Sequence, residues 1–427
     1  MRPFLVPLAL LAAGACHAAE TLEDAWRRAS EHDWLLASAR ATLQAATAEE
    51  RAARAARWPQ LEASAGYTRF ADAPALTIDT PAMQFRSPPV FADDTMIAGS
   101  ATLRVALFSG GRIAAGIDAA RRGVLGASAE VRVAESSLKL DVAEAYVAVL
   151  RGRRALAVAE ASVRSLTAHV ADVNVMVERE AAAKADLLAA RVALADAEQF
   201  RVRAQNSLSL ALAVYNRHLG EPLDRIAELD AGIPTDEALS GRSVAELTAR
   251  ALQRRAEIES LAARAAALQA QAMVERGSSL PQVSLEGGLS YLRNEILDRD
   301  RFSTVGIGVS WNVFDGGARN RAASLRAASR AAQHRVADLR SLIELEVRAS
   351  WLAVGDARAR VAATREAVAE ADENLRMARE LYASGIGTNT QVLDAVALQV
   401  RAGTNSDDAA LDASLALLRL ARAVGEL

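Results

Sequence analysis

The chain has 427 residues, of which 51% are hydrophobic and 24% charged, while only 4% are aromatic. This Ala-rich, aromatic-poor composition favours long, closely packed helices over a large globular core. The formal net charge of -3, with no basic stripe carrying interleaved aromatic residues, argues against a nucleic-acid partner.

Residues 1–19 have the form of a secretory signal peptide, with a positive start, an apolar run and small residues before Glu20. We expect cleavage after Ala18 or Ala19. The single cysteine, Cys16, lies inside this segment, so the mature chain is expected to have no disulfide or thiol chemistry. An alternative interpretation makes Cys16 a lipidated first residue, although the leucine that usually stands three places earlier is missing. No later stretch has the run of apolar residues that a transmembrane helix needs.

The first element after this segment is a predicted helix. It starts at Thr21, which begins a capping-box pattern with Asp24, and continues to the break at Pro59. A strand follows, because residues 61–68 alternate between apolar and polar side chains. The next segment, residues 72–94, contains four prolines and predicts a long irregular loop.

Alternation of this kind occurs in four stretches, which form two predicted β-hairpins at residues 60–108 and 282–314. Each strand is about ten residues long, which is the length of a tilted membrane-spanning β-strand. Four strands cannot close a barrel, and an open edge is not tolerated against lipid, so if these strands face a bilayer the barrel must be shared between copies of the chain. The residues predicted to face lipid are Leu103, Val105, Val305, Ile307, Val309 and Trp311.

The two hairpins belong to an internal duplication, which sets the domain organisation. Phe108, Gly110 and Gly111 recur as Phe314, Gly316 and Gly317, 206 residues later, and a closely similar offset relates the helices that follow. The predicted organisation is a first repeat at 20–219, an equatorial connector at 220–242 and a second repeat at 243–427. Each repeat is predicted to run helix, hairpin, long helix, turn, helix.

The long helices are predicted to form coiled coils. The first runs from Ile113 to Val177 without proline, so it would be about 100 Å long at 1.5 Å per residue. Its counterpart runs from about Ala318 to Tyr382. Turns at 178–186 and 383–388 lead to the last helix of each repeat. Apolar residues that recur every seven positions, typical of a left-handed coiled coil, are Leu156, Val163, Val170 and Val177 in one and Val361, Val368, Leu375 and Tyr382 in the other.

This order of elements resembles the TolC family of outer membrane efflux proteins, over nearly the whole mature chain. The resemblance is carried by the corners LFSGGR and VFDGGAR and by the turn YASGIGTNTQVLDA. It implies a mixed α/β membrane protein, a homotrimer in which four strands per copy build a 12-stranded outer-membrane barrel. A long α-helical coiled-coil barrel would continue it into the periplasm. The tip would stay closed until a periplasmic adaptor (membrane fusion) protein and an inner-membrane pump, resistance-type or ATP-driven, engage it.

The same resemblance assigns the pore constriction and gate. Tyr382 corresponds to the family tyrosine at the closed tip, and Asp186 to the aspartate that it contacts. Asp394 matches one of two aspartates that ring the pore at its narrowest point, and the other ring position is Gln391 here. Three Asp394 carboxylates around one axis would select cations, although a lone Asp394 is equally a solvated helix carboxylate. Tyr382 and Asp186 have simpler interpretations too, as a heptad packing residue and a helix-start carboxylate.

The predicted contact with the adaptor lies at the periplasmic tip, at Gly385, Gly387, Thr388 and Glu180. Two of these positions depart from the family pattern. Gly387 stands where the family has the arginine that latches the tip, and Glu180 stands where the first repeat usually has a glycine.

Two classes of function remain, a passive exit duct and a periplasmic coiled-coil scaffold without a pore. The hairpins favour the duct, because a scaffold needs no strands with a lipid-like face. An enzyme is not expected, since the Ser136-x-x-Lys139 spacing lies inside a long helix without companion motifs. The isolated histidines show no ligand spacing, so no metal and no cofactor are predicted. The cargo and the class of pump stay open.

Overall fold

The computed structural model describes residues 19–71, 75–89, 95–235, 237–293 and 298–427. The predicted signal peptide therefore lies outside the described residues apart from Ala19, and so does Cys16. The chain divides into two compact units, and each unit contains parts of both repeats. One comprises residues up to Ser38, Arg132–Arg255 and Ser341–Leu427, and the other comprises Ala39–Val131 and Ala256–Arg340.

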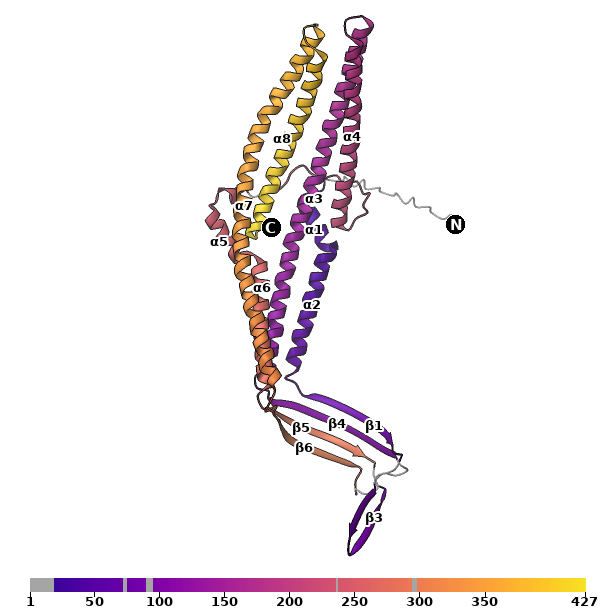
Figure 1. Ribbon diagram of the computed structural model, residues 1–427, viewed down its shortest axis with the longest axis vertical. Coiled ribbons are helices and arrows are strands. Elements are labelled where there is room, and N and C mark those ends of the chain that lie inside the picture. Colours follow the sequence, from indigo (N-terminus) through magenta and orange to yellow (C-terminus); the bar gives the residue numbers. More distant parts are fainter. Residues whose placement is uncertain (1–18, 72–74, 90–94, 236, 294–297) are drawn as a thin grey trace, which may run out of the picture. The chain divides into compact units, whose positions relative to one another are not determined.

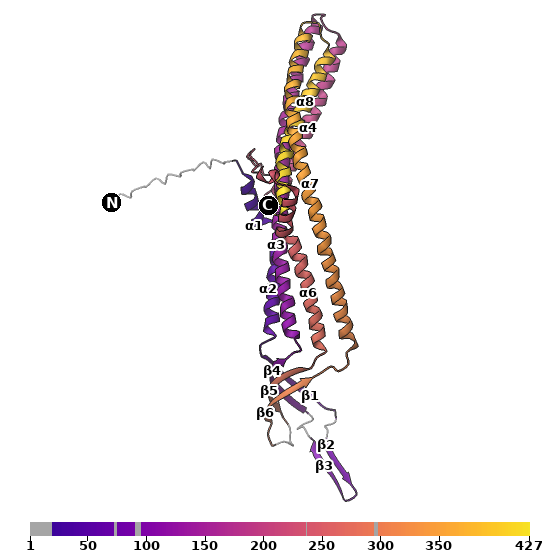
Figure 2. The same ribbon diagram turned by 90° about the vertical axis from the view of Figure 1, so that its left-hand side faces the viewer.

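The first unit is helical (Figures 1 and 2). Helices α3, with 67 residues, and α7, with 68, contribute their later parts to this unit, and each is about 100 Å long, as the sequence predicts. Among the described helices, none combines the length and the apolar character needed to cross a membrane. Its elements are α1 (Leu22–His32), the later part of α3 (Arg112–Glu178), α4 (Lys184–Leu219), the short 3₁₀ helix η2 (Glu237–Gly241), α5 (Val244–Arg254), the later part of α7 (Gly316–Ala383) and α8 (Asn389–Val424).

A heptad seam runs along α7 and confirms the predicted coiled-coil pattern. Val354, Ala357, Leu375 and Ala378 are buried. The predicted residues Val361 and Val368 are half-buried and lie between them on the same seam, in which successive positions are alternately three and four residues apart. The same seam occurs on α3, where Ala159, Leu166 and Val173 are buried beside the predicted valines. The seam therefore contains the predicted series and a second, more deeply buried series of small and branched residues.

The prediction of one continuous helix from Thr21 to Pro59 is wrong in one respect, because the structure has two helices there. Thr21 caps α1 as predicted, its hydroxyl accepting from the Asp24 amide. The chain then extends at Asp33, whose carboxylate accepts from the Leu36 amide at 2.8 Å and so caps α2 (Trp34–Ala55). The second repeat breaks likewise at Arg255, between α5 and α6 (Ala256–Ser278), so its predicted single helix is also two.

The start of the described chain is fixed to the connector within the helical unit. Glu20 pairs with Leu229 in a parallel bridge, with its amide donating to the Glu228 carbonyl at 2.7 Å. The buried Tyr146 hydroxyl lies 2.9 Å from the Glu20 carbonyl and 2.7 Å from that of Asp230. The connector is therefore held by α3 and by the chain that leads into α1.

The second unit contains the predicted strands as one antiparallel sheet in the order β1-β4-β5-β6 (Figure 1). The predicted hairpins are thus adjacent, and β1 and β6 are open edges. Helices α2 and α6 and the early parts of α3 and α7 complete the unit. The strands are β1 (Gln60–Arg69), β4 (Thr95–Phe108), β5 (Gln282–Leu292) and β6 (Arg301–Ser310).

The sheet has one apolar and one polar face, because residues directly opposite each other share a face. On the apolar face Leu103 lies opposite Gly287, and Gly287 opposite Val305, which is 84% exposed. On the other face, Arg104 forms an ion pair with Glu286 at 2.7 Å. All six predicted lipid-facing residues except Trp311 lie in strands on the apolar face.

Two expectations about the hairpins are wrong. The predicted irregular loop contains a small antiparallel pair, β2 (Ala75–Thr80) and β3 (Met83–Pro89), because Pro81 occupies the turn and Pro88 and Pro89 the strand end, where no ladder amide is needed. Trp311 also lies beyond β6. Pairing stops at Ser310 opposite Gln282, since Pro281 has no amide, and the Trp311 indole instead donates to the Ser279 carbonyl at 3.1 Å.

Candidate functional site at the helix tips

Both tip turns of the helical unit close in the same way. In the second repeat, the Ile386 amide donates to the Leu381 carbonyl at 3.0 Å, and the Gly385 amide donates to Tyr382 at 3.0 Å. This Schellman arrangement requires a left-handed residue, which Gly385 supplies with φ 76°. In the first repeat Glu180 takes this position with φ 57°, an unfavourable conformation for a residue with a side chain. The substitution noted in the sequence therefore keeps the turn but strains it.

The start of α8 carries a full capping box. Thr388 accepts from the Gln391 amide at 3.3 Å, and the Gln391 side chain accepts from the Thr388 amide at 2.8 Å. Gln391, assigned from sequence to the pore constriction, thus has a clear local function in starting α8. In the first repeat, Ala183 precedes α4 without any side-chain cap.

A buried hydrogen-bond chain joins three helices just below the turns. The His169 Nε2 atom of α3 lies 2.7 Å from Asn389 Oδ1 of α8, and Asn389 Nδ2 donates to the Asp186 carbonyl of α4 at 3.1 Å. Because the amide nitrogen is used on Asp186, the oxygen faces His169, so Nε2 must carry a proton. His169 and Asn389 are 6% and 3% exposed. No sequence spacing could have indicated this pair, whose members lie 220 positions apart.

Tyr382 lies in the apolar core that α3, α4, α7 and α8 form at this end of the unit. Its ring centroid is 5.5 Å from that of His169. Its hydroxyl is buried and has no hydrogen-bond partner among the described residues. Burial, followed by the charge of Asp186, raises the pKa of Tyr382 above its ordinary value. Tyr382 and Asp186 are therefore near neighbours without a hydrogen bond between them.

Two further assigned positions are Asp394, which faces solvent, and Gly387, where the backbone leaves little space for a side chain. Asp394 is exposed on α8, and no ion pair joins it to a residue that the structure describes. At Gly387, a Cβ atom would lie 3.0 Å from the Tyr382 amide nitrogen and 3.1 Å from the Leu381 carbonyl carbon. A side chain at position 387 would therefore make a close steric contact with the last turn of α7. The turn is packed so tightly that it favours glycine at this position.

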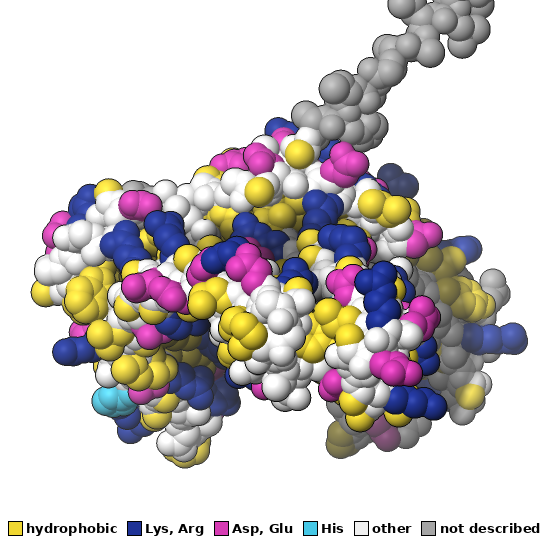
Figure 3. Space-filling view, turned by 90° about the horizontal axis from the view of Figure 1, so that it is seen from above, with side chains coloured by type: hydrophobic (Ala, Val, Ile, Leu, Met, Phe, Trp, Pro, Cys, Tyr) yellow, Lys and Arg dark blue, Asp and Glu magenta, His cyan; other side chains and the backbone are white. Residues whose placement is uncertain are grey.

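Ion pairs between the repeats occur further along the helical unit, and sequence reasoning missed them. Arg151 of α3 contacts Asp408 at 3.0 Å and Asp412 at 2.5 Å on α8, and Arg154 contacts Asp407 at 3.3 Å. These side chains are about one-third exposed or more, so each pair is worth about 1 kcal/mol or less. Seen from above, cationic and anionic side chains are mixed rather than segregated (Figure 3).

A groove of about 990 Å³ lies beside the buried chain, between α3 and α7. Its floor includes His169 and Tyr382, and its charged rim consists of Arg164, Arg179, Arg379, Asp172 and Glu380. No group of histidine, cysteine and acidic side chains suited to hold a metal occurs within the described ranges. The site is thus a packed junction of four helices with an open groove on one side.

A two-faced antiparallel sheet with open edges, joined to paired coiled coils that end in closed turns, defines a membrane channel-tunnel. Residues 26–220 and 247–426 match the family model described as outer membrane efflux protein. The chain belongs to this family, which confirms the resemblance seen in the sequence. It is an outer membrane exit duct that extends into the periplasm, and the match decides between this function and a poreless scaffold.

Solved structures show the same fold. The outer membrane protein VceC of Vibrio cholerae is 20% identical with a TM-score of 0.80, covering 95% of this chain and 96% of its own. A membrane protein of Pseudomonas aeruginosa is 22% identical with a TM-score of 0.81, covering 95% and 90%. The MtrE channel of Neisseria gonorrhoeae, in its open state, is 17% identical with a TM-score of 0.74, covering 95% and 88%. The search of curated proteins gave no match.

Proposed function

We propose that three copies of this chain form one closed duct, which passively conducts substrates delivered by an inner-membrane pump and a periplasmic adaptor. The observation that carries the proposal is the four-stranded sheet with two open edges and an apolar face. Edge strands β1 and β6 leave backbone donors and acceptors unpaired, which is not tolerated in lipid. Pairing β6 of one copy with β1 of the next, three times, removes every edge.

The first prediction concerns assembly. Because the sheet cannot close within one chain, the protein should be an obligate trimer whose stability cannot be separated from assembly. Native mass spectrometry of protein extracted from outer membrane in detergent should show the trimer as the main species. A folded monomer as the main species would contradict the proposal.

For the gate, we propose that Tyr382, Asp186 and the ring positions Asp394 and Gln391 form the constriction. Support comes from the position of Tyr382 in the core of the four tip helices and from the exposure of Asp394. The space at Gly387 is too small for the family's latching arginine without a shift of the α7 end. The buried His169–Asn389 chain, which ties α3 and α8 to α4, is available as a holding contact instead.

The second prediction tests the ring. If three Asp394 carboxylates surround the pore axis, the closed channel should favour cations and be blocked by multivalent cations from the periplasmic side. Block should be weak, because Gln391 leaves the second ring uncharged. Asp394→Asn should lower cation preference and abolish block in planar bilayers, without changing trimer yield.

Asp408→Asn is the matched control, because this α8 carboxylate faces Arg151 rather than the proposed ring. It should leave selectivity and block unchanged. Unaltered selectivity and block in Asp394→Asn would show that Asp394 is an ordinary solvated carboxylate.

The adaptor is proposed to contact the tip turns at Gly385, Gly387, Thr388 and Glu180. These residues lie at the ends of the helical hairpins, where the described chain is exposed or half-exposed. The pump is of the resistance type or ATP-driven, and it supplies both the energy and the choice of cargo. The duct itself is proposed to catalyse no reaction.

A further inference from the structure

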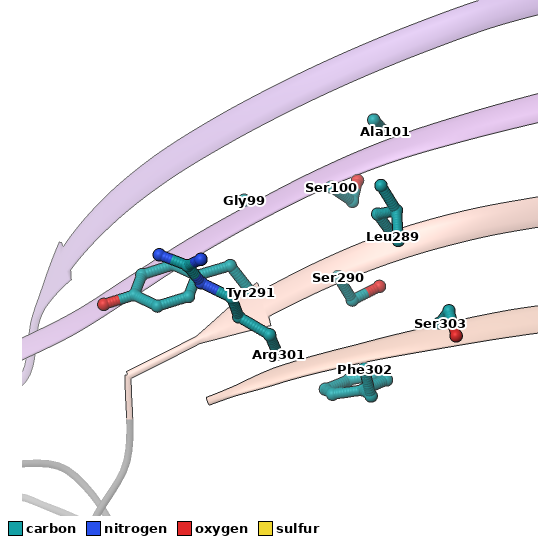
Figure 4. A pocket seen from close by; sticks show the side chains of 9 residues that line it. All are labelled: Gly99, Ser100, Ala101, Leu289, Ser290, Tyr291, Arg301, Phe302 and Ser303. Atoms are coloured by element: carbon teal, nitrogen blue, oxygen red, sulfur yellow. The ribbon is translucent and has the colours of Figure 1, made fainter. Parts of the chain in front are cut away.

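The apolar face of the sheet has a hollow at the end away from the helices (Figure 4). Its volume is about 430 Å³. It arises where two rows of opposed residues contain small side chains: Gly99 faces Tyr291, and Ala101 faces Leu289. The lining residues are Gly99, Ser100, Ala101, Leu289, Ser290, Tyr291, Arg301, Phe302 and Ser303.

One cation lines this hollow among the described residues. Arg301 is the first residue of β6, lies opposite Tyr291, and holds its guanidinium carbon 6.0 Å from the Tyr291 ring centroid. Arg301 has the same strand parity as Val305, Ile307 and Val309, so it belongs to the apolar face. An arginine on a lipid-facing surface is costly unless it lies at an interface and has an anionic partner.

In the proposed duct, the hollow would lie at the level of the outer leaflet. Strands β4 and β6 lead into α3 and α7, so the helix end of the sheet is the periplasmic end in a duct that extends into the periplasm. Tyr291 and Arg301 lie at the opposite strand ends. Tyrosine is typical of the interfacial belt there, and arginine binds phosphate through two parallel hydrogen bonds.

The nearby loop does not supply a competing cation site. Its described residues include Arg293 and Arg299, whose charges are offset by Asp298 and Asp300. None of these four lines the hollow. The combination of small residues, an aromatic ring and one arginine therefore fits a ligand with an anionic head and an apolar tail.

We propose that this hollow binds a phosphate-bearing lipid of the outer leaflet. The Arg301 guanidinium contacts the phosphate, the Tyr291 ring holds that guanidinium in place, and an acyl chain covers Gly99 and Ala101. The site rests on the proposed orientation of the apolar face toward lipid, and each trimer would carry three copies of it.

The test uses the whole trimer, purified in a neutral detergent and titrated with lipid A carrying its phosphates, with lipid A stripped of phosphate, and with inorganic phosphate. Native mass spectrometry counts bound lipid. The wild type should retain up to three phosphorylated lipids. Arg301→Gln should reduce retention about tenfold, the loss expected for one charge-assisted contact. Arg299→Gln, the same charge change outside the hollow, should retain lipid as the wild type does.

Three results would overturn the site: equal retention by Arg301→Gln, equal binding of dephosphorylated lipid A, or displacement by excess inorganic phosphate, which would indicate a free-anion site. If Arg301→Gln does not assemble, Arg301→Lys replaces it. Lysine keeps the charge but cannot form the paired hydrogen bonds, so retention should fall partly, and unchanged retention overturns the site. If the extracted protein is an intact trimer without bound lipid, this site alone is refuted. If no trimer is extracted, the proposed duct is refuted.

Discussion

Val309→Arg should lower or abolish assembly in the outer membrane, because arginine on the lipid face of such strands costs about 2 to 4 kcal/mol at the bilayer midplane and up to about 1 kcal/mol near the interfaces. Val309 lies on the apolar face, opposite Val283, and is 68% exposed within the single chain. Val309 is the second-to-last residue of β6, so a guanidinium there would lie on the apolar face close to the strand end that leads into α7. The measurement is the yield of heat-resistant trimer in isolated outer membranes.

The adjacent residue provides the control. Ser310, opposite Gln282, belongs to the polar face, so Ser310→Arg should be tolerated in the water-filled lumen. The two substitutions add the same side chain at neighbouring positions, so they differ only in the face that receives it. Equal trimer yields for both variants would mean that the faces have been assigned wrongly.

The strands and long helices could be predicted because their patterns are local. Alternation along β6 and the seven-residue spacing on α7 are visible in one stretch of chain, and the structure places both as expected. The breaks at Asp33 and Arg255 were missed, since neither is marked by proline or glycine. Arg255 is held by a distant partner, Glu346 at 2.9 Å, so only the folded unit reveals why the chain turns there.

At the helix tips, the sequence predicts the turns but not the contacts beneath them. The turns themselves follow from glycine chemistry, and Glu180 adopts the left-handed conformation of the glycine it replaces. The contacts below the turns depend on pairs such as His169 and Asn389, which no spacing rule connects. Gln391 illustrates a further limit, because a residue aligned with a pore ring also closes a capping box. The pore assignments remain predictions until the channel is measured.

The duplication predicts equal corners where strands lead into long helices, but the two corners differ. Gly110 has φ 58°, and a Cβ atom on it would lie 2.7 Å from the Gly277 carbonyl oxygen and 2.8 Å from Leu280 Cβ. Its counterpart Gly316 is the first residue of α7, and a Cβ atom there would meet nothing within 4 Å. The two glycines therefore differ in what the structure requires of them: position 110 needs glycine, whereas position 316 can accept a side chain.

Gly110→Ala should destabilise the corner by about 2 to 4 kcal/mol, because it combines a left-handed alanine with a clash against backbone. Gly316→Ala should be neutral or stabilising by up to about 1 kcal/mol, since alanine favours the helix. Thermal dissociation of the purified trimers measures both. A Gly110→Ala trimer as stable as the wild type would mean that the chain reaches the α6 end in another conformation. Equal loss in the two variants would instead make the corners equivalent, as the repeat alone suggests.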